Sequence, residues 1–105
     1  MLSGMLYRFG PFELDMARFE LRADGEPCRV EPQVLSLIAL LVENRERLVS
    51  RDEIIEKVWD GRIVSDAAIS SRIKSARQAL GDDGTAQRYI RTIHNKGLRF
   101  VAPVH

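Results

Sequence analysis

The sequence predicts an α+β fold in which a small antiparallel β-sheet is followed by three helices and a C-terminal β-hairpin. Short stretches of alternating apolar and charged residues fill positions 1–31. Apolar residues then recur at helical spacing over positions 32–81, and alternation returns around a turn over positions 88–102. A chain of 105 residues has room for one hydrophobic core, so we expect residues 1–105 to form a single domain.

The N-terminal sheet is predicted from its alternation and its turns. Gly10 and Pro11 form one turn pair, and Asp24 and Gly25 predict a hairpin. Each stretch between these turns is short and places apolar side chains on one face only. We therefore expect three or four strands, over residues 7–9, 12–15, 19–22 and 28–31.

The first two helices are predicted from their start signals. Pro32 suits a first helical position, where its missing N–H costs nothing, and the helix after it is apolar nearly all round, as in the centre of a core. Ser50 and Glu53 form a capping box for a short second helix, in which the serine accepts an amide hydrogen and the glutamate reaches back. Trp59, near the end of that helix, is expected to anchor in the core.

The third helix is predicted from Ala67 to Leu80, after an N-cap at Ser65. Its apolar stripe is Ile69, Ile73, Ala76 and Leu80. At ~100° per residue the opposite side is small, amide-bearing or basic, which differs from the mixed charges of an ordinary solvated helix. This face suits close approach to a major groove, although its two cations could also be merely solvated. Its centre is formed by Ala67, Ser71, Lys74 and Gln78, and its flanks by Ser70, Ser75 and Arg77.

The C-terminal hairpin is predicted to be basic. Its strands are residues 89–93 and 98–101, and Asn95 and Gly97 in the turn tolerate positive φ. His94, Lys96 and Arg99 could reach a phosphate strand or the minor groove beside a helix bound in the major groove, although His94 could equally be a turn residue without a contact.

The formal net charge of +1 is unevenly distributed. Residues 1–61 hold 8 Lys/Arg against 12 Asp/Glu, whereas residues 62–105 hold 8 Lys/Arg against 3 Asp/Glu. The basic part contains the third helix and the hairpin, as expected if that end faces a polyanion. The acidic part leaves a second function open, in which the N-terminal sheet docks a protein partner.

Several classes of function are excluded by composition. The single cysteine, Cys28, rules out an intramolecular disulfide framework and a Cys-rich zinc site, and it is expected to be a partly buried strand residue. No serine lies in a nucleophile motif and no carboxylates have metal-site spacing, so we expect no enzyme, cofactor or small-molecule ligand. No apolar run approaches the roughly 18 residues of a membrane span, and Met1 to Met5 lack a secretory signal, so a cytoplasmic location is expected.

Several motifs occur in the order and spacing of one family. From Phe9 to Val101 the chain resembles the OmpR/PhoB-type winged helix-turn-helix effector domain of bacterial transcription regulators. The motifs that carry the resemblance are residues 30–32, 48–54, 58–59, 76–82 with Ile73, 89–93 and 97–101.

The resemblance implies a four-stranded N-terminal sheet, three helices and a hairpin wing, and it makes residues 67–80 the recognition helix for double-stranded DNA. It implies a polymerase-contact role, found in some relatives, for the loop with Asp60, Gly61 and Arg62, although Arg62 could also face solvent or DNA. It also implies head-to-tail pairs on tandem repeats. Contacts to bases and phosphates would come from Ser70, Ser71, Lys74, Ser75, Arg77 and Gln78.

The chain departs from the family pattern in the wing and in its control. The turn reads Asn95-Lys96-Gly97-Leu98 where Gly-x-Gly-Tyr is common, and His94 stands where some members place a minor-groove arginine. Asn95 can adopt the left-handed conformation, so we expect the turn to survive. No receiver domain lies in these residues, which leaves a piece of a longer sensor as a third interpretation.

Overall fold

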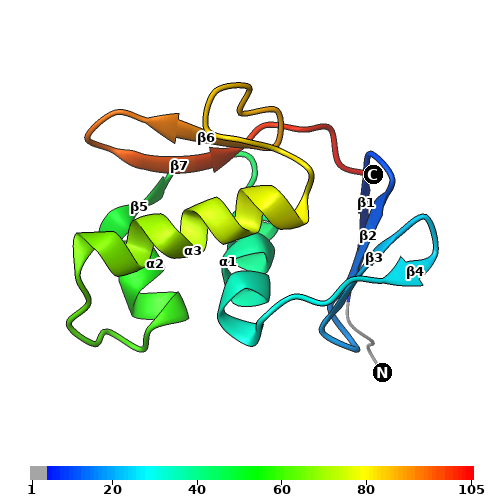
Figure 1. Cartoon of the computed structure of the whole chain (residues 1–105), viewed down its shortest axis with the longest axis horizontal. Helices are drawn as coiled ribbons and strands as arrows, with labels where there is room; N and C mark the ends of the chain where they lie inside the picture. The colour runs from blue at the N-terminus through cyan, green and yellow to red at the C-terminus, as the bar shows by residue number, and fades with distance from the viewer. Residues whose placement is uncertain (1–4) are drawn as a thin grey trace.

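The computed structural model describes residues 5–105, so most of the segment used to judge a secretory signal lies outside the described residues. The order of sheet, three helices and C-terminal hairpin confirms the predicted fold class (Figure 1). The elements are β1 (Leu6–Phe9), β2 (Phe12–Asp15), β3 (Glu20–Ala23), β4 (Glu26–Pro27), α1 (Pro32–Glu43), β5 (Val49–Ser50), α2 (Arg51–Val58), α3 (Asp66–Ala79), β6 (Ile90–Ile93) and β7 (Gly97–Phe100).

Strands β1 to β4 form an antiparallel sheet in sequence order. Its inner face is apolar because alternate residues of each strand point to the core. The buried residues of this face are Tyr7, Phe9, Phe12, Leu14 and Leu21. The fourth strand differs from the prediction: residues 28–31 are not a strand, and the β3–β4 hairpin instead pairs Arg22 with Pro27 and Ala23 with Glu26. Pro27 has no N–H to donate, which suits the edge position of β4 and a short pairing.

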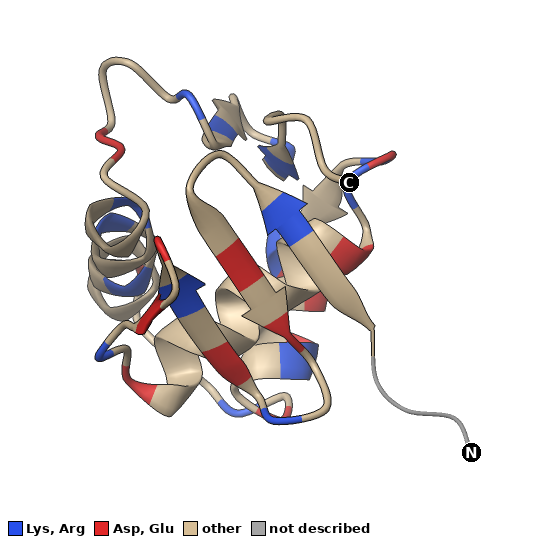
Figure 2. Cartoon of the chain, turned by 90° about the vertical axis from the view of Figure 1, so that its right-hand side faces the viewer, with Lys and Arg blue, Asp and Glu red and all other residues tan. Residues whose placement is uncertain are grey.

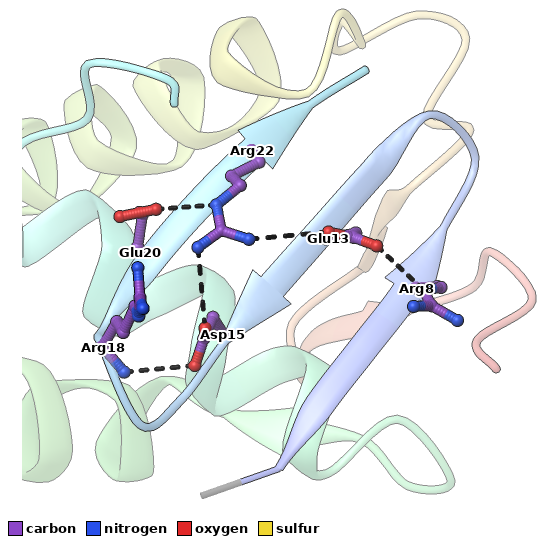
Figure 3. Close-up of polar contacts among 6 residues, drawn as sticks. All are labelled: Arg8, Glu13, Asp15, Arg18, Glu20 and Arg22. Carbon is purple, nitrogen blue, oxygen red and sulfur yellow. Dashed lines mark hydrogen bonds and ion pairs between the residues drawn. The ribbon is translucent and has the colours of Figure 1, made fainter. Parts of the chain in front are cut away.

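The outer face of this sheet carries a network of ion pairs (Figure 3). Arg22 lies among three carboxylates, with Nε 2.8 Å from Glu20 and its terminal nitrogens 3.8 Å from Glu13 and from Asp15. Arg8 pairs with Glu13 at 2.9 Å. Both signs therefore alternate across the strands in Figure 2. This pairing largely neutralises the acidic surface that docking of a partner on the sheet would require.

Helix α1 is the centre of the core. Eight of its side chains are buried, and it packs against α2, α3 and β7. Trp59 is 9% exposed and belongs to the same apolar cluster, which confirms its expected anchoring role. An almost wholly apolar helix is stable in this position because the core covers most of its surface.

Helices α2 and α3 form the helix-turn-helix pair, and a serine caps each of them. The hydroxyl oxygen of Ser50 accepts a hydrogen bond from the amide of Glu53, and that of Ser65 accepts one from Ala68, both at 3.1 Å. The other half of the predicted capping box, in which the Glu53 side chain reaches back to the amide of Ser50, is wrong. The carboxylate of Glu53 instead accepts hydrogen bonds from Arg47 at 2.6 and 2.8 Å, because that guanidinium offers a charged, forked donor.

A second sheet, in the order β5-β7-β6, joins the wing to the helices. The two-residue strand β5, which local sequence patterns did not predict, pairs Val49 with Leu98 and Ser50 with Gly97. Gly97 has a φ of 152°, and a Cβ there would lie 2.1 Å from the carbonyl oxygen of Val49. Only glycine allows β5 and β7 to approach this closely.

The two sheets meet through an aromatic cluster and the C-terminal residues. Rings of Phe9, Phe12, Tyr89 and Phe100 lie with centroids 5.0–6.2 Å apart. His105 exchanges two backbone hydrogen bonds with Arg8 on the open edge of β1, at 2.8 and 3.1 Å, as the C-terminus beside β1 in Figure 1 shows. The base of the wing is thus tied to the N-terminal sheet as well as to the helices.

Candidate nucleic-acid interface

The exposed face of α3 has nearly the predicted composition. Ser70, Ser71, Lys74 and Gln78 are exposed, and Ser75 is half-buried at its margin. Lys74 makes no hydrogen bond or ion pair within the described part of the chain, so its ammonium group is available to a partner. Short side chains around a single cation leave the backbone of α3 accessible to a large, negatively charged surface.

Arg77 is less accessible than the sequence suggested. It lies on a flank of the outer face of α3, as expected, but it is only 9% exposed, so the expectation that its side chain is available to DNA there is wrong. Its Nε and one terminal nitrogen donate to the carbonyl of Ile90 at 3.2 and 3.1 Å, and the same terminal nitrogen donates to the hydroxyl of Thr92 at 2.8 Å. The wing packs over this flank of α3, which removes Arg77 from solvent and commits its guanidinium to β6.

Asp82, just after α3, is a second link to the wing that sequence patterns did not single out. Its carboxylate accepts hydrogen bonds from the amides of Asp83 and Arg88 on one oxygen and of Tyr89 and Ile90 on the other, at 2.8–3.2 Å. Burial raises the pKa of this carboxyl group, but the four backbone donors outweigh burial and hold its pKa below the usual range. We infer that Arg77 and Asp82 fix the wing relative to α3.

The wing presents basic side chains on its turn and its outer face. His94, Lys96 and Arg99 are all exposed, as expected, and Asn95 has a φ of 59°, the left-handed conformation foreseen for the turn. Arg91, which the sequence interpretation left out of the site, lies directly opposite Arg99 in the β6–β7 register. Like charges in opposite positions destabilise a strand pair, so this arrangement favours an anionic partner.

A groove of about 470 Å³ lies between the N-terminal half of α3 and the turn of the wing. Its apolar lining includes Ile69, Ile73 and Ile93, and Ser70 and Lys96 also line it. The groove places the exposed face of α3 and the basic turn on the same side of the protein.

The loop between α2 and α3 carries the residues expected to meet a polymerase. Asp60, Gly61 and Arg62 are exposed, and Asp60 and Gly61 have positive φ values of 53° and 73°. The next residue, Ile63, is fully exposed, which is unusual for a large aliphatic side chain. Arg51 and Asp66 form an ion pair that joins the N-terminal ends of α2 and α3.

Other kinds of site find little support in residues 5–105. No group of three or more His, Cys, Asp or Glu side chains there is arranged to hold a metal ion. No helix of the described part is long and apolar enough to cross a membrane. Cys28 is half-buried, as expected, although it follows β4 instead of lying in a strand, and burial raises the pKa of its thiol. A raised thiol pKa disfavours the reactive thiolate.

Known proteins resemble this chain over most of its length. The transcriptional activator CadC of Escherichia coli is 28% identical over 86 residues, which are 81% of this chain and 17% of that protein. The response regulator DrrB of Thermotoga maritima, an OmpR/PhoB homologue, superposes with a TM-score of 0.81 at 30% identity, over 90% of this chain and 43% of DrrB. The DNA-binding domain of Klebsiella pneumoniae RstA, solved with its RstA box, shares the fold with a TM-score of 0.79 at 22% identity, over 90% and 95% of the two chains.

The chain therefore spans about a sixth of the length of the curated relative CadC. Residues 25–100 match the family described as transcriptional regulatory protein, C terminal. This match extends from the end of the N-terminal sheet to the last strand of the wing and includes the whole helix-turn-helix pair. The chain belongs to this family of transcription regulator domains, the OmpR/PhoB-type winged helix-turn-helix domains.

Proposed function

We propose that this chain binds double-stranded DNA sequence-specifically to regulate transcription, with α3 in the major groove and the wing on the adjacent backbone or minor groove. The observation that carries the proposal is the pairing of an exposed α3 face of serines, Lys74 and Gln78 with a basic wing on the same side of the protein. An α-helix fits the major groove, and small side chains let its backbone come close to the bases.

Affinity and specificity have separate sources in this arrangement. Lys96, Arg91 and Arg99 would contact phosphates, and such contacts supply affinity without reading sequence. Lys74 and Gln78 project from the centre of the exposed face of α3, where a lysine can donate to guanine and a glutamine can pair with adenine. Ser70, Ser71 and Ser75 add short donors for phosphates or bases, and His94 adds a further side chain at the tip of the wing.

Polymerase contact and pairing on DNA belong to the same proposal. The α2–α3 loop, which holds Asp60, Gly61 and Arg62, lies on the side of the helices away from the wing (Figure 1), and the exposed Ile63 offers an apolar contact beside these residues. A protein surface is the partner that would bury such a side chain. Two copies on tandem repeats would combine their binding free energies. Such pairing suits a domain that acts in the cytoplasm and whose modest net charge limits the affinity of a single copy.

Selection of random duplexes with the purified chain, followed by footprinting, tests the function and gives the repeat spacing. Lys74→Ala should weaken binding to the selected duplex by about 1–3 kcal/mol and relax preference at one base position. Lys96→Ala should weaken binding to selected and shuffled duplexes alike and flatten the salt dependence. Failure of the wild-type chain to bind any duplex at low salt would refute the proposal.

A further inference from the structure

Helix α3 has two flanks beside its exposed face, and the wing covers only one of them. Asp66, Ser70 and Ile73 face the groove shared with the wing, and Arg77 donates to β6 on the same side. On the opposite side, Ser75, Gln78 and Ala79 line a shallow groove of about 330 Å³ with the segment between β4 and α1. At about 3.6 residues per turn, Ser75 and Arg77 lie on opposite sides of the exposed face.

Arg29 lies in that second groove. Its side chain is exposed and lines the groove together with Ser75 and Gln78 of α3. Arg29 comes from the acidic part of the chain, so the distribution of charge along the sequence gave no reason to select it. The fold nevertheless places it beside the C-terminal half of the recognition helix.

Arg29 also differs from most basic residues of the first half of the chain in having no ionic partner. Carboxylates hold the guanidinium groups of Arg8, Arg22, Arg47 and Arg51. Within residues 5–105, Arg29 makes neither an ion pair nor a hydrogen bond, although Glu31 lines the same groove. Its charge is therefore available to an external anion.

The major groove has a sugar–phosphate strand along each of its two edges. A helix in this groove, about 12 Å wide, has phosphates on both flanks. On one flank the wing supplies Lys96, which lines the groove that it shares with α3. On the other flank, Arg29 lines the same groove as Gln78 of the exposed face.

We propose that Arg29 is a DNA-contacting residue that binds a phosphate on the edge of the major groove opposite the wing. With the wing it forms a two-sided clamp that sets how deeply and at what angle α3 enters the groove. The inference rests on the proposed DNA binding and adds a contact from a segment outside the helix-turn-helix pair and the wing. Glu31 opposes the contact because it is an acidic group near the same phosphate.

The test compares Arg29→Ala with Arg18→Ala, which removes the same charge from the turn between β2 and β3, a position on the N-terminal sheet. Fluorescence anisotropy would measure binding to the selected duplex and to a shuffled duplex between 50 and 200 mM salt, about the range in which phosphate contacts dominate the salt effect. Arg29→Ala should weaken both complexes and make the negative slope of log K against log salt shallower by about 0.9, the value for one phosphate contact. Arg18→Ala should leave the slope unchanged, and Glu31→Gln should strengthen binding.

A second measurement locates the phosphate. Single methylphosphonate substitutions, which remove one backbone charge at a time, should reveal a position that weakens the wild-type chain but not the Arg29→Ala variant. That position should lie on the opposite edge of the major groove from the positions that lose their effect in Lys96→Ala. Equal slopes for the wild type and Arg29→Ala, with normal wild-type binding, would overturn this inference alone, whereas absence of wild-type binding would overturn the proposed function with it.

Discussion

Replacing Arg77 by methionine separates the structural and the sequence-based interpretations of this residue. Methionine keeps an unbranched apolar chain in the buried position but cannot donate the three hydrogen bonds to Ile90 and Thr92. Hydrogen bonds from a charged group are worth roughly 1.5–3 kcal/mol, and a buried carbonyl left without a donor costs about 1–3 kcal/mol. We therefore expect the free energy of unfolding to fall by about 2–4 kcal/mol.

Urea unfolding followed by tryptophan fluorescence measures this loss, because Trp59 is the only tryptophan and is 9% exposed. With a urea slope of about 1.5 kcal/mol per molar, the midpoint should fall by about 1.3–2.7 M. Lys74→Met is the matched control, since it removes the same charge from the exposed face of α3. That variant should change the free energy of unfolding by no more than about 0.5 kcal/mol.

The two variants should also differ in DNA binding. Lys74→Met should weaken binding to the selected duplex while leaving the free energy of unfolding unchanged. Arg77→Met should lower the free energy of unfolding while leaving binding to the selected duplex unchanged. Equal urea midpoints for Arg77→Met and the wild type, together with weaker DNA binding by Arg77→Met, would refute the inference that Arg77 fixes the wing relative to α3. They would indicate instead that Arg77 faces DNA.

Two further predictions concern the attachment of the wing. Asp82→Asn should lower the free energy of unfolding by roughly 1.5–3 kcal/mol at pH 7, because a neutral amide replaces the charged acceptor of four amides. The folded-state pKa of Asp82 is depressed, so its contribution is present above the unfolded-state pKa of about 3.9 and is lost as the pH falls through the lower folded-state value. Unfolding midpoints measured between about pH 2 and 7 should therefore converge for the variant and the wild type at the acid end, and a constant difference would contradict this account. Gly97→Ala should destabilise the fold because the new Cβ would lie 2.1 Å from the carbonyl oxygen of Val49, and thermal unfolding should show a lower Tm. Gly25→Ala is the control, because a Cβ at this turn meets nothing within 4 Å, so this variant measures the cost of positive φ alone.

Local sequence signals predicted the helices and the first three strands because each depends on residues close together in the chain. Pro32 begins α1, and Ser50 and Ser65 cap α2 and α3 as expected. The apolar stripe of α3 also faces the core, with Ile69, Ala76 and Leu80 buried. Strand β5 was missed because two residues give no period, and its pairing partner lies almost 50 residues further along the chain.

The candidate site was predicted less completely than the fold. Its exposed serines, Lys74 and Gln78 could be found from helical spacing, since they lie well inside the outward face. Arg77 lies at the edge of that face, where exposure depends on what packs beside the helix. The sequence motif contained Asp82 without revealing its role, because its carboxylate binds amides six to eight residues later, and Arg29 gave no signal because it lies beside α3 only in the folded chain.

The sequence by itself determined which segments form helices and hairpins and which faces are apolar, because these follow from periodicity, caps and turns. Its motifs were also enough to suggest the family. Only the tertiary structure decided which cations remain available: the wing buried Arg77, carboxylates paired with Arg8 and Arg22, and Arg29 was left unpaired beside the recognition helix. The physical reason is that the role of a charged side chain depends on its neighbours in space, and those neighbours come from distant parts of the chain.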